Sequence, residues 1–175
     1  LQQIGIMYTT VGKSGFITAM YIVIVPILGI FLKKRVGGKV WLGVAMAVVG
    51  LYFLCMTAGN ISLQKGDVLT FLCAVTFSFH ILTVDYFAPQ IDGVKLSCIQ
   101  FATCGLLSEI GMCLFETPTI EAVLAAWLPI LYAGALSSGV AYTLQIIGQR
   151  GMNPTVASLL MSMESVISVI AGWLI

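Results

Sequence analysis

Long apolar stretches, each about as long as a lipid bilayer is thick, follow one another along almost the whole chain. Six of them occupy residues 14–32, 40–56, 67–87, 94–115, 120–148 and 154–175, and a shorter one covers 1–8. A helix rises 1.5 Å per residue, so about 20 apolar residues cross the roughly 30 Å of hydrocarbon. Charged residues make up 9% of the chain, far below the roughly 25% of soluble domains. The pattern predicts an all-α fold, a polytopic bundle of membrane helices.

The remaining composition argues against several other functions. The net charge is +1 and the longest basic tract is Lys33-Lys34-Arg35, so we expect no nucleic-acid partner. The cysteines lie in apolar runs without CxxC or Cys/His ligand spacing, which predicts neither a metal site nor a cofactor. They are Cys55, Cys73, Cys98, Cys104 and Cys113.

The distribution of Lys and Arg predicts the orientation of the bundle, because cytoplasmic loops are enriched in positive charge. Breaker residues between the apolar runs, such as Gly37-Gly38, Ala58-Gly59-Asn60 and Thr117-Pro118, leave short loops and therefore antiparallel neighbours. One set of alternate loops holds Lys33, Lys34, Arg35, Lys39, Lys95 and Arg150; the other holds Lys13 and Lys65 with Asp67, Glu116 and Glu121. We therefore place the loops at 33–39, 86–95 and 149–153 in the cytoplasm.

The two ends of the chain resemble each other at an offset of 143 residues. Leu1, Gln2, Gly5 and Met20 recur as Leu144, Gln145, Gly148 and Met163. Five complete helices separate the copies, and a duplicated unit with an odd number of spans inserts its second copy upside down. Such inverted repeats are typical of secondary transporters. Because the chain begins at Leu1 and stops inside an apolar run, we expect it to be a fragment.

Two stretches resemble the EamA-type transporters of the drug/metabolite transporter superfamily. The first is Tyr8-Thr-Thr-Val-Gly-Lys-Ser-Gly-Phe-Ile-Thr-Ala-Met-Tyr21 with Val25-Pro26; the second is Ala141-Tyr-Thr-Leu-Gln145 with Asn153-Pro-Thr-Val-Ala-Ser-Leu-Leu-Met-Ser-Met-Glu164. One position departs from the family, which often has proline where this chain has Ser165.

This resemblance implies ten helices in two inverted five-helix repeats. Residues 1–58 would then end the first repeat, and 66–175 would form the second repeat without its last helix; helices 1, 2 and 10 would be absent. It also implies a multi-pass protein of the cell membrane, in bacteria the inner membrane. The expected function is secondary transport of a small organic solute by alternating access, as an exporter or exchanger. The expected partners are that solute and the lipid bilayer, with a homodimer left open, and no enzymatic activity is expected. An intramembrane enzyme and a non-catalytic membrane scaffold are the alternatives.

Polar residues at membrane depth are the candidates for the solute site, because burying an ionisable group in lipid costs at least about 2.5 kcal/mol. Glu164 lies near the middle of its run, and Tyr21 is its counterpart in the repeat, with Thr18 nearby. Tyr142 and Gln145 share a helix face with Gln149.

Two further candidates lie on other helices. His80, the one histidine, has Thr76 and Thr83 within one turn and is more simply a histidine satisfied inside the bundle. Gln100 is a second cavity candidate, whereas Glu109, nine positions further along the same helix, falls on the opposite face. Each candidate has a structural alternative, since polar side chains also join membrane helices by hydrogen bonds.

A topology experiment checks the orientation. Three spans separate Lys34 from Glu116 in the predicted order, so the two positions should lie on opposite sides of the bilayer. Single cysteines at these positions of the full-length protein should react with a membrane-impermeant thiol reagent from opposite faces. Labelling of both from one face would contradict the predicted fold.

Overall fold

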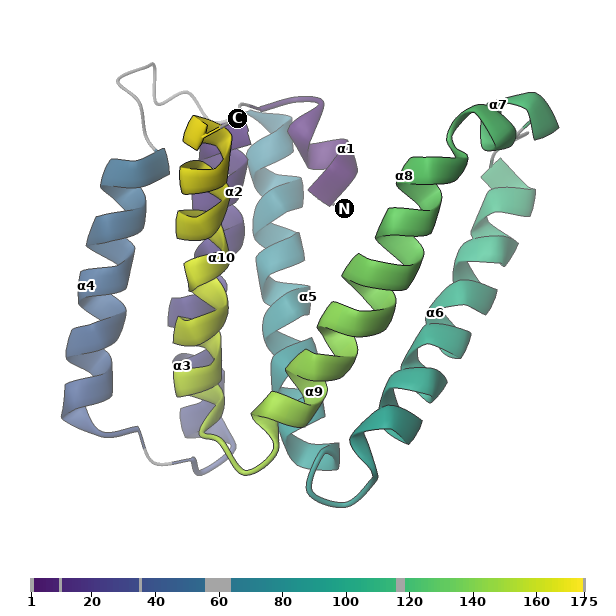
Figure 1. Ribbon diagram of the computed structural model, residues 1–175. Helices are drawn as coiled ribbons and strands as arrows, with labels where there is room; N and C mark the ends of the chain where they lie inside the picture. The colour runs from purple at the N-terminus through teal and green to yellow at the C-terminus, as the bar shows by residue number, and fades with distance from the viewer. Residues whose placement is uncertain (1, 10, 35, 56–63, 116–118, 175) are drawn as a thin grey trace. The chain divides into compact units, whose positions relative to one another are not determined.

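The computed structural model describes residues 2–9, 11–34, 36–55, 64–115 and 119–174, and its secondary structure over these ranges is entirely helical (Figure 1). The helices are α1 (Gln2–Ile6), α2 (Val11–Ala19), α3 (Tyr21–Phe31), α4 (Gly38–Cys55), α5 (Lys65–Phe87), α6 (Gly93–Phe115), α7 (Ile120–Ala125), α8 (Trp127–Leu131), the π-helix η1 (Tyr132–Tyr142), α9 (Thr143–Gln149) and α10 (Pro154–Leu174). Each predicted apolar run is helical, which confirms the all-α fold. Arg35, Glu116 and the breakers at 58–60 and 117–118 lie outside the described residues.

Four of the described helical stretches are long and apolar enough to cross a membrane. They are Lys13–Phe31, Lys65–Phe87, Gly93–Phe115 and Trp127–Gln149. The apolar part of α4, Gly38–Phe53, is shorter. A chain with several such helices is a multi-pass membrane protein, as its sequence predicts.

The helices form two compact units. The first contains residues 1–83 and 152–175, and the second contains 84–151. The first unit combines helices from both expected repeats, because α10 of the second repeat packs on α3 and α4 of the first. The repeat boundaries at 58 and 66 concern the duplication in the sequence and stay a prediction.

Within the first unit, α10 and α3 run in opposite directions (Figure 1). At the 143-residue offset, α3 corresponds to the second half of α10, so the segments of the predicted duplication pack antiparallel. On α4, a Cβ added at Gly43 would lie 3.6 Å from Leu159 Cδ1 of α10, an ordinary contact distance. Small residues at such positions let membrane helices approach closely.

The run at 14–32 is divided into α2 and α3 at Met20. The amide of Met20 donates to the Ile17 carbonyl at 3.2 Å, an i to i−3 bond, before regular helical bonding resumes. Pro26 lies inside α3 and is buried. Proline lacks an amide hydrogen and weakens the helix on its N-terminal side. The apolar run at 14–32 does not predict this interruption at Met20.

A Schellman motif ends α3. Lys33 has a φ of 59°, and its amide donates to Ile30 O at 2.9 Å. The Lys34 amide donates to Gly29 O, also at 2.9 Å. These bonds satisfy carbonyls that the helix end would leave unpaired. The left-handed residue that terminates the helix is therefore a lysine, four residues before the predicted breaker at Gly37.

The start of α5 meets α1 through glycines. A Cβ added at Gly66 would lie 2.4 Å from the Gly5 carbonyl oxygen, and one added at Gly5 would lie 2.7 Å from Thr70 Cγ2. These distances are shorter than side-chain carbons tolerate. The two helices therefore touch backbone to backbone, which only glycine permits at Gly66.

An ion pair joins α2 to the same end of α5. Lys13 Nζ donates to Asp67 Oδ2 at 2.5 Å, and Thr9 Oγ1 donates to Asp67 Oδ1 at 2.8 Å. The Gln64 amide also donates to Asp67 Oδ2, at 2.8 Å. Asp67 is almost fully buried, so these donors replace its lost hydration.

In the second unit, α6 and α9 pack together. Asp92 caps α6, since its Oδ1 accepts hydrogen bonds from the amides of Val94 and Lys95 at 3.0 and 3.3 Å. A Cβ added at Gly93 would lie 2.9 Å from Ile147 Cγ1 of α9. The two helices therefore meet where α6 begins and α9 ends.

The run at 120–148 is not one regular α-helix. It breaks at Ala126, and Tyr132–Tyr142 adopt π-helical hydrogen bonding. Pro129 falls in the first turn of α8, where proline is tolerated. The π-helix contains Gly134 and Gly139, and apolar periodicity does not distinguish it from an α-helix.

The contact between α1 and α5 predicts opposite effects for two glycine substitutions. Gly66→Ala should destabilise the full-length protein by about 1–3 kcal/mol, since its methyl group overlaps the Gly5 carbonyl. Gly15→Ala, on α2 with nothing within 4 Å, should be neutral or stabilising by about 0.5–1 kcal/mol. Thermal unfolding in detergent measures both. Equal midpoints for the two variants would contradict this packing.

Replacing one partner of the ion pair should cost more stability than replacing both partners. Asp67→Asn leaves the nearly buried Lys13 ammonium without its counter-charge and should lower stability by about 3 kcal/mol. The double change Lys13→Met with Asp67→Leu should cost less than Asp67→Asn alone, because no unpaired charge remains. Lys65→Gln, on an exposed side chain of the same helix end, is the control. A double variant less stable than Asp67→Asn would argue against a buried pair.

Candidate functional site

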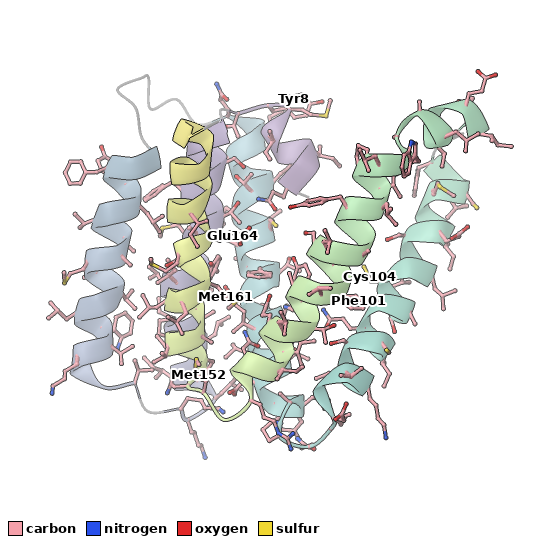
Figure 2. All side chains as sticks on the ribbon, viewed as in Figure 1. Tyr8, Phe101, Cys104, Met152, Met161 and Glu164 are labelled. Atoms are coloured by element: carbon pink, nitrogen blue, oxygen red, sulfur yellow. The ribbon has the colours of Figure 1, made fainter. Side chains whose placement is uncertain are left out.

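Tyr21 and Glu164 lie on the antiparallel helices α3 and α10. Glu164 is ten residues from each end of α10 and lies within electrostatic range of Tyr21. Tyr21 is buried, whereas Glu164 is exposed and lines a shallow groove with Leu160, Met161, Met163 and Ile167. Figure 2 labels Glu164 about halfway along α10, with Met161 one turn nearer the start of the helix. The structure thus brings two predicted site residues together.

Aromatic contacts connect Tyr21 to His80. The rings of Tyr21 and Phe77 meet edge to face, with centroids 5.2 Å apart and planes at 70°. Phe77 stacks on His80 at 5.7 Å and 18°. Such geometries are favourable for aromatic pairs, at about 0.5–1.5 kcal/mol each. His80 is therefore held against α3 through Phe77.

The threonines next to His80 have other partners. Thr76 Oγ1 donates to the Leu72 carbonyl and Thr83 Oγ1 to the Phe79 carbonyl, each at 2.8 Å and each four residues earlier on α5. Both side chains are exposed. The sequence spacing suggested a polar cluster around His80, but these hydroxyls bond within their own helix.

Thr18 lies one turn before Tyr21 along α2. Its Oγ1 is buried and has no hydrogen-bond partner, and the same is true of Ser14 Oγ one turn earlier. Ser14 is 1% exposed. A stripe of two hydroxyls and a phenol therefore runs along α2 and α3, with spacings of four and three residues.

Gln100, Tyr142 and Gln145 belong to the second unit. Gln100 is on α6, which packs on α9. Tyr142 ends η1, and Gln145 is on α9, which continues directly from η1. All three side chains are half-buried. Gln145 Nε2 is buried without a partner, and Gln149, one turn further on, is buried. The predicted stripe through Tyr142, Gln145 and Gln149 is thus the less exposed face of its helix. Glu109, on α6, is exposed.

The predicted site residues therefore fall into two groups. Thr18, Tyr21, His80 and Glu164 belong to the first unit; Gln100, Tyr142 and Gln145 belong to the second. The sequence reading missed Ser14 and Phe77. Both could have been found from spacing, since Ser14 is four residues before Thr18 and Phe77 three before His80.

The chemistry of the first group suits recognition of a polar organic molecule. It offers a carboxyl group, a phenol, an imidazole and hydroxyls beside aromatic rings. Within the described residues, no three His, Cys, Asp or Glu side chains are grouped so that they could hold a metal ion.

Comparison with known proteins places the chain in a family. The EamA-like transporter family matches residues 64–175. A protein of Archaeoglobus fulgidus described as an uncharacterized transporter is 30% identical over 166 residues, which cover 94% of this chain and 53% of that protein. The chain thus spans about half the length of this curated relative, and no solved structure matches it. The match over more than half of its residues assigns the chain to the EamA-like transporter family.

Proposed function

We propose that the chain is the central part of a secondary transporter of the cell membrane that moves a small organic solute by alternating access, as an exporter or exchanger. Its family, the transporter relative and its apolar helices support a transport role. The loops at 33–39, 86–95 and 149–153 lie in the cytoplasm in this proposal, because they hold most of the Lys and Arg residues.

The observation that carries the proposal is the pairing of repeat counterparts. Tyr21 and Glu164 occupy equivalent positions at the 143-residue offset, on the helices α3 and α10 that pack against each other. When two antiparallel copies are related by a two-fold axis, a residue meets its own counterpart at that axis. Secondary transporters bind their solute near the membrane midplane at this repeat interface.

The residues around this axis have distinct roles in the proposed site. Glu164 binds a polar group of the solute or exchanges a proton with it. Tyr21, Phe77 and His80 form an aromatic wall whose orientation is fixed by ring contacts. Thr18 and Tyr21 supply hydroxyl groups beside that wall. In the second unit, Gln100, Tyr142 and Gln145 are further candidates for solute contact, with amide and phenol groups.

Glu164→Gln tests the site in the full-length protein. In proteoliposomes that hold a solute gradient, the wild type should accumulate or exchange at least one member of a panel of labelled amino acids, sugars and nucleosides. The variant should transport that solute at least about tenfold more slowly, a loss of about 1.4 kcal/mol. Glu109→Gln, the neutralisation of an exposed acid on α6, should keep the wild-type rate within about twofold.

Two results would contradict the proposal. An intact protein that moves no member of the panel would argue against transport. Equal rates for the wild type and Glu164→Gln would place the solute elsewhere.

Chemical modification of a lipid or peptide without a gradient would indicate an enzyme instead.

A further inference from the structure

Most hydroxyl groups on the described helices bond to their own backbone. The donors bond to a carbonyl three or four residues earlier; they are Thr70, Thr76, Ser78, Thr83, Ser97, Thr103, Thr143, Ser158 and Ser162. This bond satisfies the hydroxyl donor in a region where no water is available. Such residues have no free donor for another molecule.

Ser14 and Thr18 differ from this pattern. Ser14 Oγ and Thr18 Oγ1 are buried and make no hydrogen bond. An unsatisfied buried hydroxyl costs about 1–3 kcal/mol. Four residues before Thr18, the Ser14 carbonyl offers the same bond, yet Thr18 Oγ1 does not donate to it. The two hydroxyls are therefore directed elsewhere.

Their position lies between two contacts of α2 and α3 with α5. On one side of them along the chain, Lys13 pairs with Asp67. On the other side, Tyr21 packs against Phe77. Eight residues separate Lys13 from Tyr21, and ten separate Asp67 from Phe77, so each segment covers about 12–15 Å of helix.

Small residues occupy the buried face of α5 between these contacts. Thr70 and Ala74 are both 0% exposed. Thr70 uses its hydroxyl on the carbonyls of Gly66 and Asp67. Ala74 has no polar group. Neither residue makes a hydrogen bond to Ser14 or Thr18.

We propose that Ser14 and Thr18 line the solute pathway between the Lys13–Asp67 ion pair and the Tyr21–Phe77 contact. Their hydroxyls bind uncharged hydrogen-bonding groups of the solute, such as hydroxyl, carbonyl or amide groups, and they bind water when no solute is present. This inference rests on the proposed transport function and extends the proposed site along α2 from Thr18 to Ser14.

Cysteine accessibility tests the pathway without knowledge of the solute. Ser14→Cys and Thr18→Cys are made separately in a cysteine-free variant of the full-length protein. Membrane vesicles are treated with the charged, membrane-impermeant reagent MTSET, applied to one face or the other. Both cysteines should react, from at least one face, because a water-filled pathway reaches them during the transport cycle.

Thr70→Cys is the matched control. It makes the same substitution as Thr18→Cys on a different helix, α5, at a side chain that is fully buried and bonded to its own helix. Its reaction with MTSET should be at least about tenfold slower than that of either test position. If Ser14→Cys does not reach the membrane, Thr18→Cys gives the same comparison.

Two results would overturn the inference. No reaction at positions 14 and 18 from either face would mean that these hydroxyls are sealed in the protein. Equal reaction at 14, 18 and 70 would mean general loosening of the unit. Because labelling needs no transported solute, either result would leave the transport assay of Glu164→Gln to be judged independently.

Discussion

The hydrocarbon of a bilayer offers no hydrogen-bond partner, and this constraint explains most of the structure. Backbone groups must pair within helices, and the described chain has no other secondary structure. Most hydroxyls pair with their own helix for the same reason. Among the described residues, polar groups that depart from this rule include the Lys13–Asp67 ion pair, Glu164, Gln145 Nε2 and the hydroxyls of Ser14 and Thr18. Because each departure costs energy in lipid, these are the places where function is expected.

The antiparallel packing of α3 on α10 connects the sequence repeat to the site. A duplication in sequence does not by itself say which residues meet. Once the copies pack antiparallel, equivalent residues near their common axis approach each other, and Tyr21 and Glu164 are equivalent positions on the packed helices α3 and α10. One position carries a phenol and the other a carboxyl group, instead of two carboxyl groups. The site is therefore chemically asymmetric, which avoids the repulsion of two like charges in a medium of low dielectric constant.

Hydropathy predicted the helices well, because a span of about 20 apolar residues is required whatever the packing. It could not predict where those helices are interrupted. The break at Met20 and the π-helix at Tyr132–Tyr142 depend on local hydrogen bonding that does not change the apolar pattern. Asp67 and Lys13 were read as loop charges, although they form a buried pair, since pairing between distant segments is a tertiary property. For the site, spacing selected Thr18 and His80 as candidates but did not point to Phe77, whose ring stacks on His80.

The stabilising contacts of the first unit are unevenly distributed, and this suits a protein that must change shape. Apolar surface gives little net drive for helix association in lipid, so close backbone packing and polar pairs carry more of the energy. In this unit they concentrate at two levels: the Gly5–Gly66 contact with the Lys13–Asp67 pair, and the rings of Tyr21, Phe77 and His80. Between these levels, Phe16 of α2 packs edge to face on Tyr52 of α4, with ring centroids 5.9 Å apart, while the hydroxyls of Ser14 and Thr18 have no partner. Because apolar contacts resist separation only weakly in lipid, α2 can move there at lower cost than at either level, and a solute pathway between the levels requires such movement.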